Sequence, residues 1–173
     1  MREKAILLIA VASLRLGAQH ANARPIKTVL FVCEHGTVRS LLAKVLFEEY
    51  AAEVGLQMQA ASRGTRADSV VPPWMQWGLA ADHVALGSWR PQTLRPADLA
   101  NASYVVSFDV PIAATIAARA PQAHWDGLPS VSQDYSSGRK AIKARVHQLV
   151  DSLQRANGTR RVATPGPVRI RAR

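Results

Sequence analysis

Near its start the chain reads Thr28-Val-Leu-Phe-Val-Cys33-Glu-His-Gly-Thr-Val-Arg39-Ser40, and this stretch decides the fold. It begins with a β-branched and aromatic run, the pattern of a buried strand, and apolar residues at helical spacing follow from Leu41 to Ala51. A loop between a strand and a helix N-terminus suits an anion, because backbone N–H groups point into it and the helix dipole adds positive potential. The sequence therefore predicts an oxyanion-binding loop directly after the first strand.

Three side chains of this stretch suit phosphate chemistry. Cys33 is the only cysteine of the chain, and the positive potential of such a loop favours its reactive thiolate form. Arg39 offers a planar fork that can bind two phosphate oxygens at once, and Ser40 can donate a hydrogen bond to the sulfur. The alternative is a cysteine that is simply a small buried apolar residue. The strand-to-helix context favours a phosphate loop, whose predicted phosphate-binding residues are Glu34, His35, Gly36, Thr37, Val38, Arg39 and Ser40.

This arrangement resembles the low-molecular-weight protein tyrosine phosphatases and the arsenate reductases that share their fold. The resemblance rests on Cys33, five intervening residues, and then Arg39 and Ser40; it continues through Ser62-Arg-Gly-Thr65 and Val105-Val-Ser-Phe-Asp109 and covers about 27–153. It implies that Cys33 attacks phosphorus while Arg39 and the loop amides hold the phosphoryl oxygens. It also implies that no cofactor and no metal is needed.

The loop departs from the family pattern at two positions. Gly36 stands where the family usually has an asparagine that holds a left-handed backbone turn. Glycine reaches that conformation without steric cost, but it brings no side-chain hydrogen bonds. Val38 replaces the second loop cysteine of many phosphatases, so no neighbouring thiol can protect Cys33 as a disulfide.

Strands and helices alternate along the rest of the chain. We expect strands at 28–33, 56–62 and 104–108 and a short one opening at His124-Trp125, and helices at 41–51, 70–81, 111–120 and 139–153, the last ending at Asn157-Gly158. This order predicts an α/β fold: a four-stranded parallel sheet flanked by helices on both faces, with the phosphate loop after the first strand. Trp74 and Trp77 lie three apart and are expected to pack in the core or at its rim, with the substrate cleft as the alternative.

The sequence leaves the general acid open. The departing oxygen of a phosphate ester needs a proton, and the resembling family supplies it from an aspartate that precedes a proline after the fourth strand. Here Asp126 is separated from Pro129 by two residues. We take Asp126 as the expected catalytic acid, with Asp134 or no acid at all as the alternatives. Asp109 is expected to cap the following helix or to steady the phosphate loop. His35 is expected to turn outward or to satisfy a backbone group.

Both ends of the chain differ in composition from its middle. Residues 1–23 predict a signal peptide, because Arg2 and Lys4 precede ten largely apolar residues and Ala21-Asn-Ala23 is a small-x-small cleavage site. The apolar run is too short to span a bilayer. A phosphatase-like domain is expected over 24–158 and a basic, disordered tail over 159–173. The protein is then periplasmic or secreted, or cytoplasmic if the segment is no signal.

The distribution of charge and the positions of the histidines limit which partners and ligands are expected. The formal net charge is +10, but residues 159–173 alone carry five arginines and no acid, so the expected partner is a phosphorylated protein or small molecule rather than nucleic acid. No metal site is expected, because the five histidines are scattered. Two other functions remain open: an arsenate reductase that uses an external thiol, since a single cysteine allows no internal disulfide, and an inactive oxyanion-binding module without the acid.

Overall fold

A parallel sheet forms the centre of the molecule. The structure, a computed structural model, describes residues 27–112 and 120–162. Its four strands are all parallel and lie in the order β2-β1-β3-β4. They are β1 (Lys27–Cys33), β2 (Met58–Gly64), β3 (Tyr104–Ser107) and β4 (Gln122–His124). The central position of β1 follows from its sequence, because the consecutive apolar residues 29–32 are buried and only a strand covered on both faces tolerates such a run.

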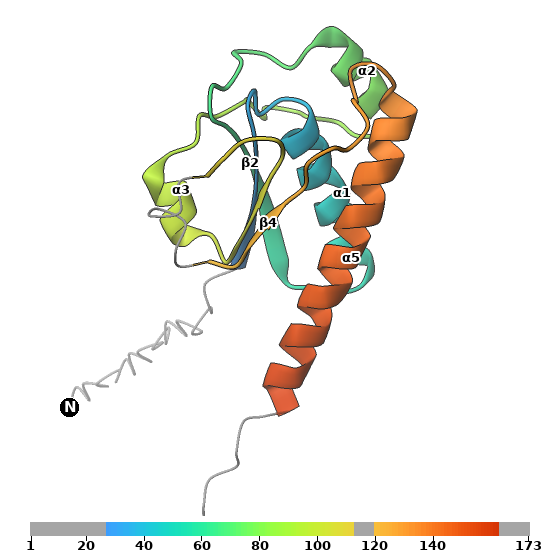
Figure 1. Cartoon of the computed structure of the whole chain (residues 1–173). Helices are drawn as coiled ribbons and strands as arrows, with labels where there is room; N and C mark the ends of the chain where they lie inside the picture. Colours follow the sequence, from blue (N-terminus) through green and yellow to red (C-terminus); the bar gives the residue numbers. More distant parts are fainter. Residues whose placement is uncertain (1–26, 113–119, 163–173) are drawn as a thin grey trace, which may run out of the picture.

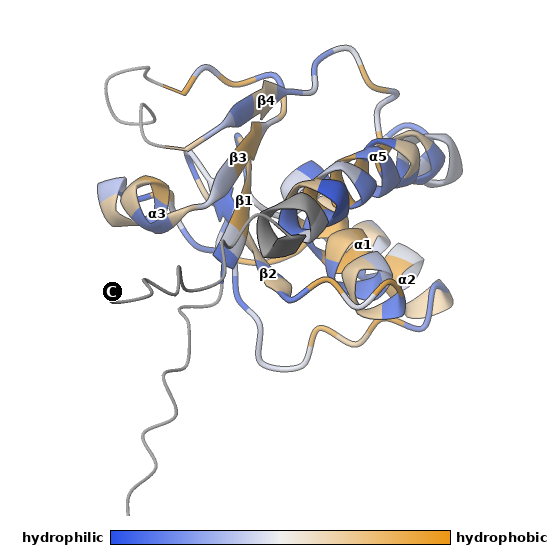
Figure 2. Cartoon of the chain, turned by 90° about the horizontal axis from the view of Figure 1, so that it is seen from below, coloured by the Kyte–Doolittle hydropathy of each residue, from blue (hydrophilic) through white to orange (hydrophobic). Residues whose placement is uncertain are grey.

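Helices cover both faces of the sheet. They are α1 (Arg39–Glu53), α2 (Pro73–Ala81), α3 (Pro96–Asn101) and α5 (Tyr135–Val162). Figures 1 and 2 place α3 on one face and α1, α2 and α5 on the other. Successive side chains of a strand point to opposite faces, so β1 feeds two cores: Val29 and Phe31 pack in the larger one, Leu30 and Val32 in the smaller one with Leu99 of α3. The predicted four-stranded parallel sheet with helices on both faces is confirmed.

The end of the last helix was predicted wrongly. The apolar periodicity stops at Leu153, and Asn157-Gly158 was expected to end the helix, but α5 continues to Val162. One glycine costs a helix only about 1 kcal/mol, and side-chain contacts hold this end in place. Lys27 Nζ donates to Asn157 Oδ1 at 3.0 Å, and Gln154 Nε2 donates to the Val54 carbonyl oxygen at 2.8 Å.

Other predicted elements differ less. Pro73 begins α2 and Pro72 precedes it, as expected of prolines confined to a first turn. Trp74 packs against the larger core, but Trp77 is 72% exposed, so the expectation that it packs in the core or at its rim is wrong. Most of the predicted helix over 111–120 lies outside the described residues.

The strand register gathers the loops that matter at one edge of the sheet. Cys33 at the end of β1 pairs with Gly64 at the end of β2, and Val32 pairs with Ser107, the last residue of β3. Ser107 in turn pairs with His124, which ends β4. The carboxyl ends of all four strands therefore meet, the edge at which open α/β sheets bind ligands. No helix among the described residues is long and apolar enough to cross a membrane.

Candidate active site

The sulfur of Cys33 lies in a polar, nearly closed environment. The residue is 7% exposed. The Gly36 N–H donates to Cys33 Sγ at 3.2 Å, and Ser40 Oγ lies 3.0 Å from the sulfur. The loop leads directly into α1, whose N-terminus carries a partial positive charge. The sulfur thus lies among polar groups at the N-terminal end of α1, a place that suits a bound anion.

The buried hydroxyls of Ser40 and Ser62 form a short hydrogen-bonded chain that leads away from the sulfur. Ser62 Oγ lies 2.9 Å from Ser40 Oγ and 3.0 Å from the Gly36 carbonyl oxygen. Each hydroxyl has one proton to donate. When Ser40 donates to an ionised sulfur, its oxygen is free to accept the proton of Ser62. Ser62 therefore contacts the sulfur only indirectly, through Ser40. The family-like run over 62–65 was the sequence signal for Ser62.

The loop rests on the end of β2 through two glycines. Gly36 has a φ of 72°, which confirms the left-handed turn expected where the family has asparagine. A Cβ atom on Gly36 would lie 2.8 Å from the backbone nitrogen of Gly64, and one on Gly64 would lie 2.8 Å from the carbonyl carbon of His35. Both distances are far below van der Waals contact with backbone atoms. The two glycines therefore permit an approach of loop and strand that no larger residue allows.

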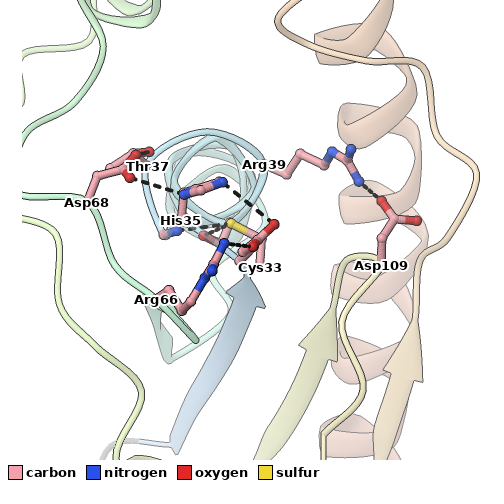
Figure 3. Close-up of polar contacts among 10 residues, drawn as sticks. Cys33, His35, Thr37, Arg39, Arg66, Asp68 and Asp109 are labelled. Atoms are coloured by element: carbon pink, nitrogen blue, oxygen red, sulfur yellow. Dashed lines mark hydrogen bonds and ion pairs between the residues drawn. The ribbon is translucent and has the colours of Figure 1, made fainter.

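Asp68 fixes the outer side of the loop, and sequence reasoning missed it. Its N–H donates to the His35 carbonyl oxygen at 3.0 Å. Its carboxylate accepts from Thr37 Oγ1 at 2.7 Å and lies 3.1 Å from His35 Nδ1 (Figure 3). The His35 side chain is 52% exposed, as expected of a residue turned outward. No local pattern around Asp68 marks it, because its role depends on the approach of β2 to the loop.

A pocket of about 200 Å³ opens above the sulfur. This is below the usual size of sites for whole drug-like ligands, so it suits a small anionic group better than a large ligand. Of the predicted phosphate-binding residues, Gly36, Thr37 and Ser40 are buried and do not line it. The segment 130–132 before α5 forms one wall, which the sequence did not reveal. The lining residues are Cys33, Glu34, His35, Val38, Arg39, Phe108, Asp109, Val110, Ser130, Val131 and Ser132.

The predicted phosphate ligand Arg39 is ion-paired with Asp109, the residue that follows the end of β3 by two positions. Asp109 also links to Asp126: its N–H donates to Asp126 Oδ1 at 3.0 Å, and the Gly127 N–H donates to Asp109 Oδ1 at 3.3 Å. The structure thus brings Asp126 to the edge of the site, although Asp126 does not line the pocket. Of the two roles expected for Asp109, the contact with Arg39 favours steadying the phosphate loop.

Asp134, the alternative acid, caps a helix. It precedes α5 and accepts from the Ser137 N–H at 3.1 Å and the Ser137 hydroxyl at 2.6 Å, the arrangement of an N-cap. The hydrogen bonds from the Ser137 hydroxyl and backbone N–H lower the pKa of Asp134 below its ordinary value. A carboxyl with a lowered pKa is a poor proton donor at neutral pH. Within the described residues no group of three or more histidine, cysteine, aspartate or glutamate side chains is placed to hold a metal ion.

Comparison with known proteins agrees with this geometry. Residues 28–158 match the family described as low molecular weight phosphotyrosine protein phosphatase. The chain belongs to this family. The match spans the phosphate loop, all four strands and α5 up to Gly158. The resemblance inferred from Cys33, Arg39 and Ser40 is thereby confirmed, and with it the assignment to a phosphatase-type hydrolase.

Solved structures share the fold of this family member at low sequence identity. YfkJ from Bacillus subtilis is 20% identical with a TM-score of 0.65, over 76% of this chain and 96% of that one. A thioredoxin-dependent arsenate reductase from Corynebacterium glutamicum is 24% identical with a TM-score of 0.62, over 78% and 65%. The Bacillus subtilis YwlE arginine phosphatase is 21% identical with a TM-score of 0.64, over 73% and 95%. The search of curated proteins gave no match.

Proposed function

We propose that this chain hydrolyses phosphomonoesters, of the tyrosine phosphate type, through a cysteinyl-phosphate intermediate on Cys33. The observation that carries the proposal is the surroundings of the sulfur, with the Gly36 N–H at 3.2 Å and Ser40 Oγ at 3.0 Å at the head of α1. An ionised sulfur is the nucleophile in such chemistry. The pocket of about 200 Å³ above it has room for a phosphoryl group.

The reaction proceeds in two displacements. The Cys33 thiolate attacks phosphorus, the bond from phosphorus to the ester oxygen breaks, and a general acid gives that oxygen a proton. Water then gives a proton to the ionised general acid and attacks the cysteinyl phosphate, the phosphorus–sulfur bond breaks, and phosphate leaves while the thiolate and the acid are restored. Arg39 stabilises the charge on the phosphoryl oxygens in both steps, and Ser40 stabilises the sulfur when it leaves phosphorus in the second step.

We assign the acid to Asp126. Its carboxylate is held beside the pocket residue Asp109, whereas Leu128 occupies the position before Pro129 and Asp134 caps α5. A missing acid slows substrates with poor leaving groups most, because activated phenoxides depart without a proton. We therefore expect Asp126→Asn to slow an alkyl phosphate much more than p-nitrophenyl phosphate, and to flatten the basic limb of the pH–rate profile. Asp134→Asn is the matched control, and a response in that variant instead would move the acid there.

The deciding experiment is a turnover assay on a panel of phosphate compounds. It contains p-nitrophenyl phosphate, a phosphotyrosine peptide and, because one structure of this fold is named an arginine phosphatase, phosphoarginine. Cys33→Ser should abolish turnover while inorganic phosphate still binds, since a serine hydroxyl is hardly ionised at neutral pH. Hydrolysis by this variant at more than a small percentage of the wild-type rate would overturn the assignment of the nucleophile.

Arsenate reduction is the second candidate, because an arsenate reductase shares the fold. With one cysteine, this chain would need an external thiol to reduce the arsenate bound to Cys33. The same preparation is therefore assayed for arsenate reduction with a small thiol present. Reduction without phosphatase turnover would favour the reductase, and phosphate binding without either activity would favour an inactive oxyanion-binding module.

A further inference from the structure

The guanidinium of Arg39 is bound by a carboxylate on a different element. Arg39 begins α1, whereas Asp109 follows β3, and Nη1 of the arginine pairs with Oδ2 of the aspartate. Figure 3 shows the two side chains extended toward one another. Both also line the pocket above Cys33. The carboxylate therefore occupies a donor that an incoming phosphoryl group needs.

Asp109 is held rigidly in this position. Its φ of 50° places it in the left-handed region, which costs an ordinary residue energy and is best tolerated by asparagine, aspartate and glycine. Its N–H and one of its carboxylate oxygens are tied to the segment after β4, to Asp126 and Gly127 respectively. Strained backbone at a ligand site persists only where its surroundings hold it there. The other carboxylate oxygen, Oδ2, is the one left to Arg39.

From this geometry we propose that Asp109 is an internal competitor for the phosphate-binding arginine and sets how tightly the site holds an oxyanion. The proposal rests on the proposed function only in requiring an oxyanion site at Cys33. A dianionic phosphoryl group displaces the carboxylate from Arg39, because it brings more charge and the hydrogen bonds of the loop as well. As the phosphate departs, the carboxylate returns to the guanidinium, and this exchange favours product release.

The ion pair is weak enough to be displaced. The side chains of Arg39 and Asp109 are 29% and 42% exposed, so water screens their attraction. Exposed pairs of this kind are commonly worth no more than a factor of about five in an equilibrium constant. The other acid on the pocket wall, Glu34, pairs with Arg66 and lies 3.6 Å from His35 Nε2. Asp109 is thus the carboxylate that competes for Arg39, and Glu34 offers a control of equal charge.

The substitution Asp109→Asn tests the proposal cleanly. Asparagine tolerates the left-handed backbone and keeps an oxygen to accept the Gly127 N–H, but it removes the charge that attracts Arg39. We expect inorganic phosphate, titrated calorimetrically into the full chain, to bind about two- to fivefold more tightly. The inhibition constant of phosphate against p-nitrophenyl phosphate should fall by the same factor. If thermal unfolding shows that this variant is not folded, Asp109→Gly accepts the same backbone and replaces it.

The control variant Glu34→Gln separates competition from general electrostatics. It removes one negative charge from the pocket wall without touching Arg39, so its effect on phosphate binding measures charge alone. If Asp109 competes for Arg39, the gain in phosphate affinity in Asp109→Asn should be at least twice the gain in Glu34→Gln. This difference should persist at about 0.5 M salt, where longer-range electrostatic effects are screened. Equal gains in both variants, or weaker binding in Asp109→Asn, overturn the proposal, and the second result makes Asp109 an anchor for Arg39. If neither wild type nor Asp109→Asn binds phosphate, the oxyanion site itself fails, and the proposed function fails with it.

Discussion

At the scale of single residues, polar groups of the phosphate loop converge on the sulfur of Cys33. The Gly36 N–H lies 3.2 Å and the Ser40 hydroxyl 3.0 Å from the sulfur of Cys33. Such fixed donors stabilise developing charge without reorganising during the reaction. Changes of single atoms at this scale should therefore alter rates much more than they alter the fold.

Arg39→Lys tests the importance of the planar fork. A lysine keeps the charge but cannot bind two phosphoryl oxygens in one plane. We expect kcat to fall about 10²- to 10³-fold, the scale for loss of one donor that stabilises the transition state. Steady-state kinetics on p-nitrophenyl phosphate measures it. An unchanged kcat with a raised KM would instead make Arg39 a ground-state binding residue.

Gly64→Ala tests the close approach of loop and strand. A Cβ atom at Gly64 would lie 2.8 Å from two backbone carbons, of Ala67 and His35, so the loop must move or β2 must yield. We expect kcat/KM to fall about tenfold or more, because a displaced loop misplaces the reacting groups, and the midpoint of thermal unfolding to fall as well. Gly158→Ala is the matched control, because nothing lies within 4 Å of a Cβ atom there and alanine suits a helix better. Equal activity of Gly64→Ala and wild type would show that the loop tolerates the shift.

Among the elements, α5 is held in place by contacts at its N-terminus. Asp134 satisfies the N–H of Ser137, and the Asp134 carbonyl oxygen accepts from Gly138 at 3.0 Å. Close by, the Tyr135 hydroxyl donates to Asp82 Oδ2 at 2.7 Å, joining α5 to the end of α2. Burial, followed by this hydrogen bond, raises the pKa of Tyr135, so the phenol keeps its proton and this link across the physiological range. The start of α5 is thus fixed by its cap and by α2.

Loss of the cap should be measurable as a change in stability that depends on pH. We expect Asp134→Ala to lower the midpoint of thermal unfolding by a few degrees at pH 7, and Asp134→Asn to lower it little, since asparagine caps equally well. Because the hydrogen bonds from Ser137 lower the pKa of Asp134 in the folded state, its contribution is complete above the unfolded value of about 4 and disappears as the pH falls through the folded value. Melting curves at pH 7 and near pH 3 should show wild type losing stability relative to Asp134→Asn. A constant difference would contradict the cap.

At the scale of the whole molecule, the chain has segments on either side of the family match, which covers 28–158. We propose that residues 1–23 direct export, on the strength of the Arg2 and Lys4 pair, the apolar run and Ala21-Asn-Ala23. Cleavage after Ala23 would leave Arg24 as the first residue, only three positions before β1 begins at Lys27. Mass spectrometry of protein from the native host should find this mature N-terminus outside the cytoplasm. An intact Met1 in the cytoplasm would remove the export proposal.

Local patterns in the sequence determined the fold and the centre of the site. A β-branched and aromatic run favours a strand, and an apolar run without alternation is typical of a parallel sheet covered by helices on both sides. Cys33 and Arg39 flank one short loop, at the end of β1 and the start of α1, so both residues could be assigned without knowing what packs around them. The end of α5 could not be assigned in this way, because contacts from Lys27 and to Val54 hold residues beyond the apolar periodicity.

Only the tertiary structure decided which distant residues complete the site. Ser62 and Asp68 lie in and just after β2, and Asp109 lies just after β3, and the parallel register brings them to the end of β1. It also separated Asp134, which serves a helix, from Asp126, which lies beside Asp109. The physical reason is that a hydrogen bond or ion pair depends on distances of about 3 Å, which sequence spacing fixes within one element but not between elements.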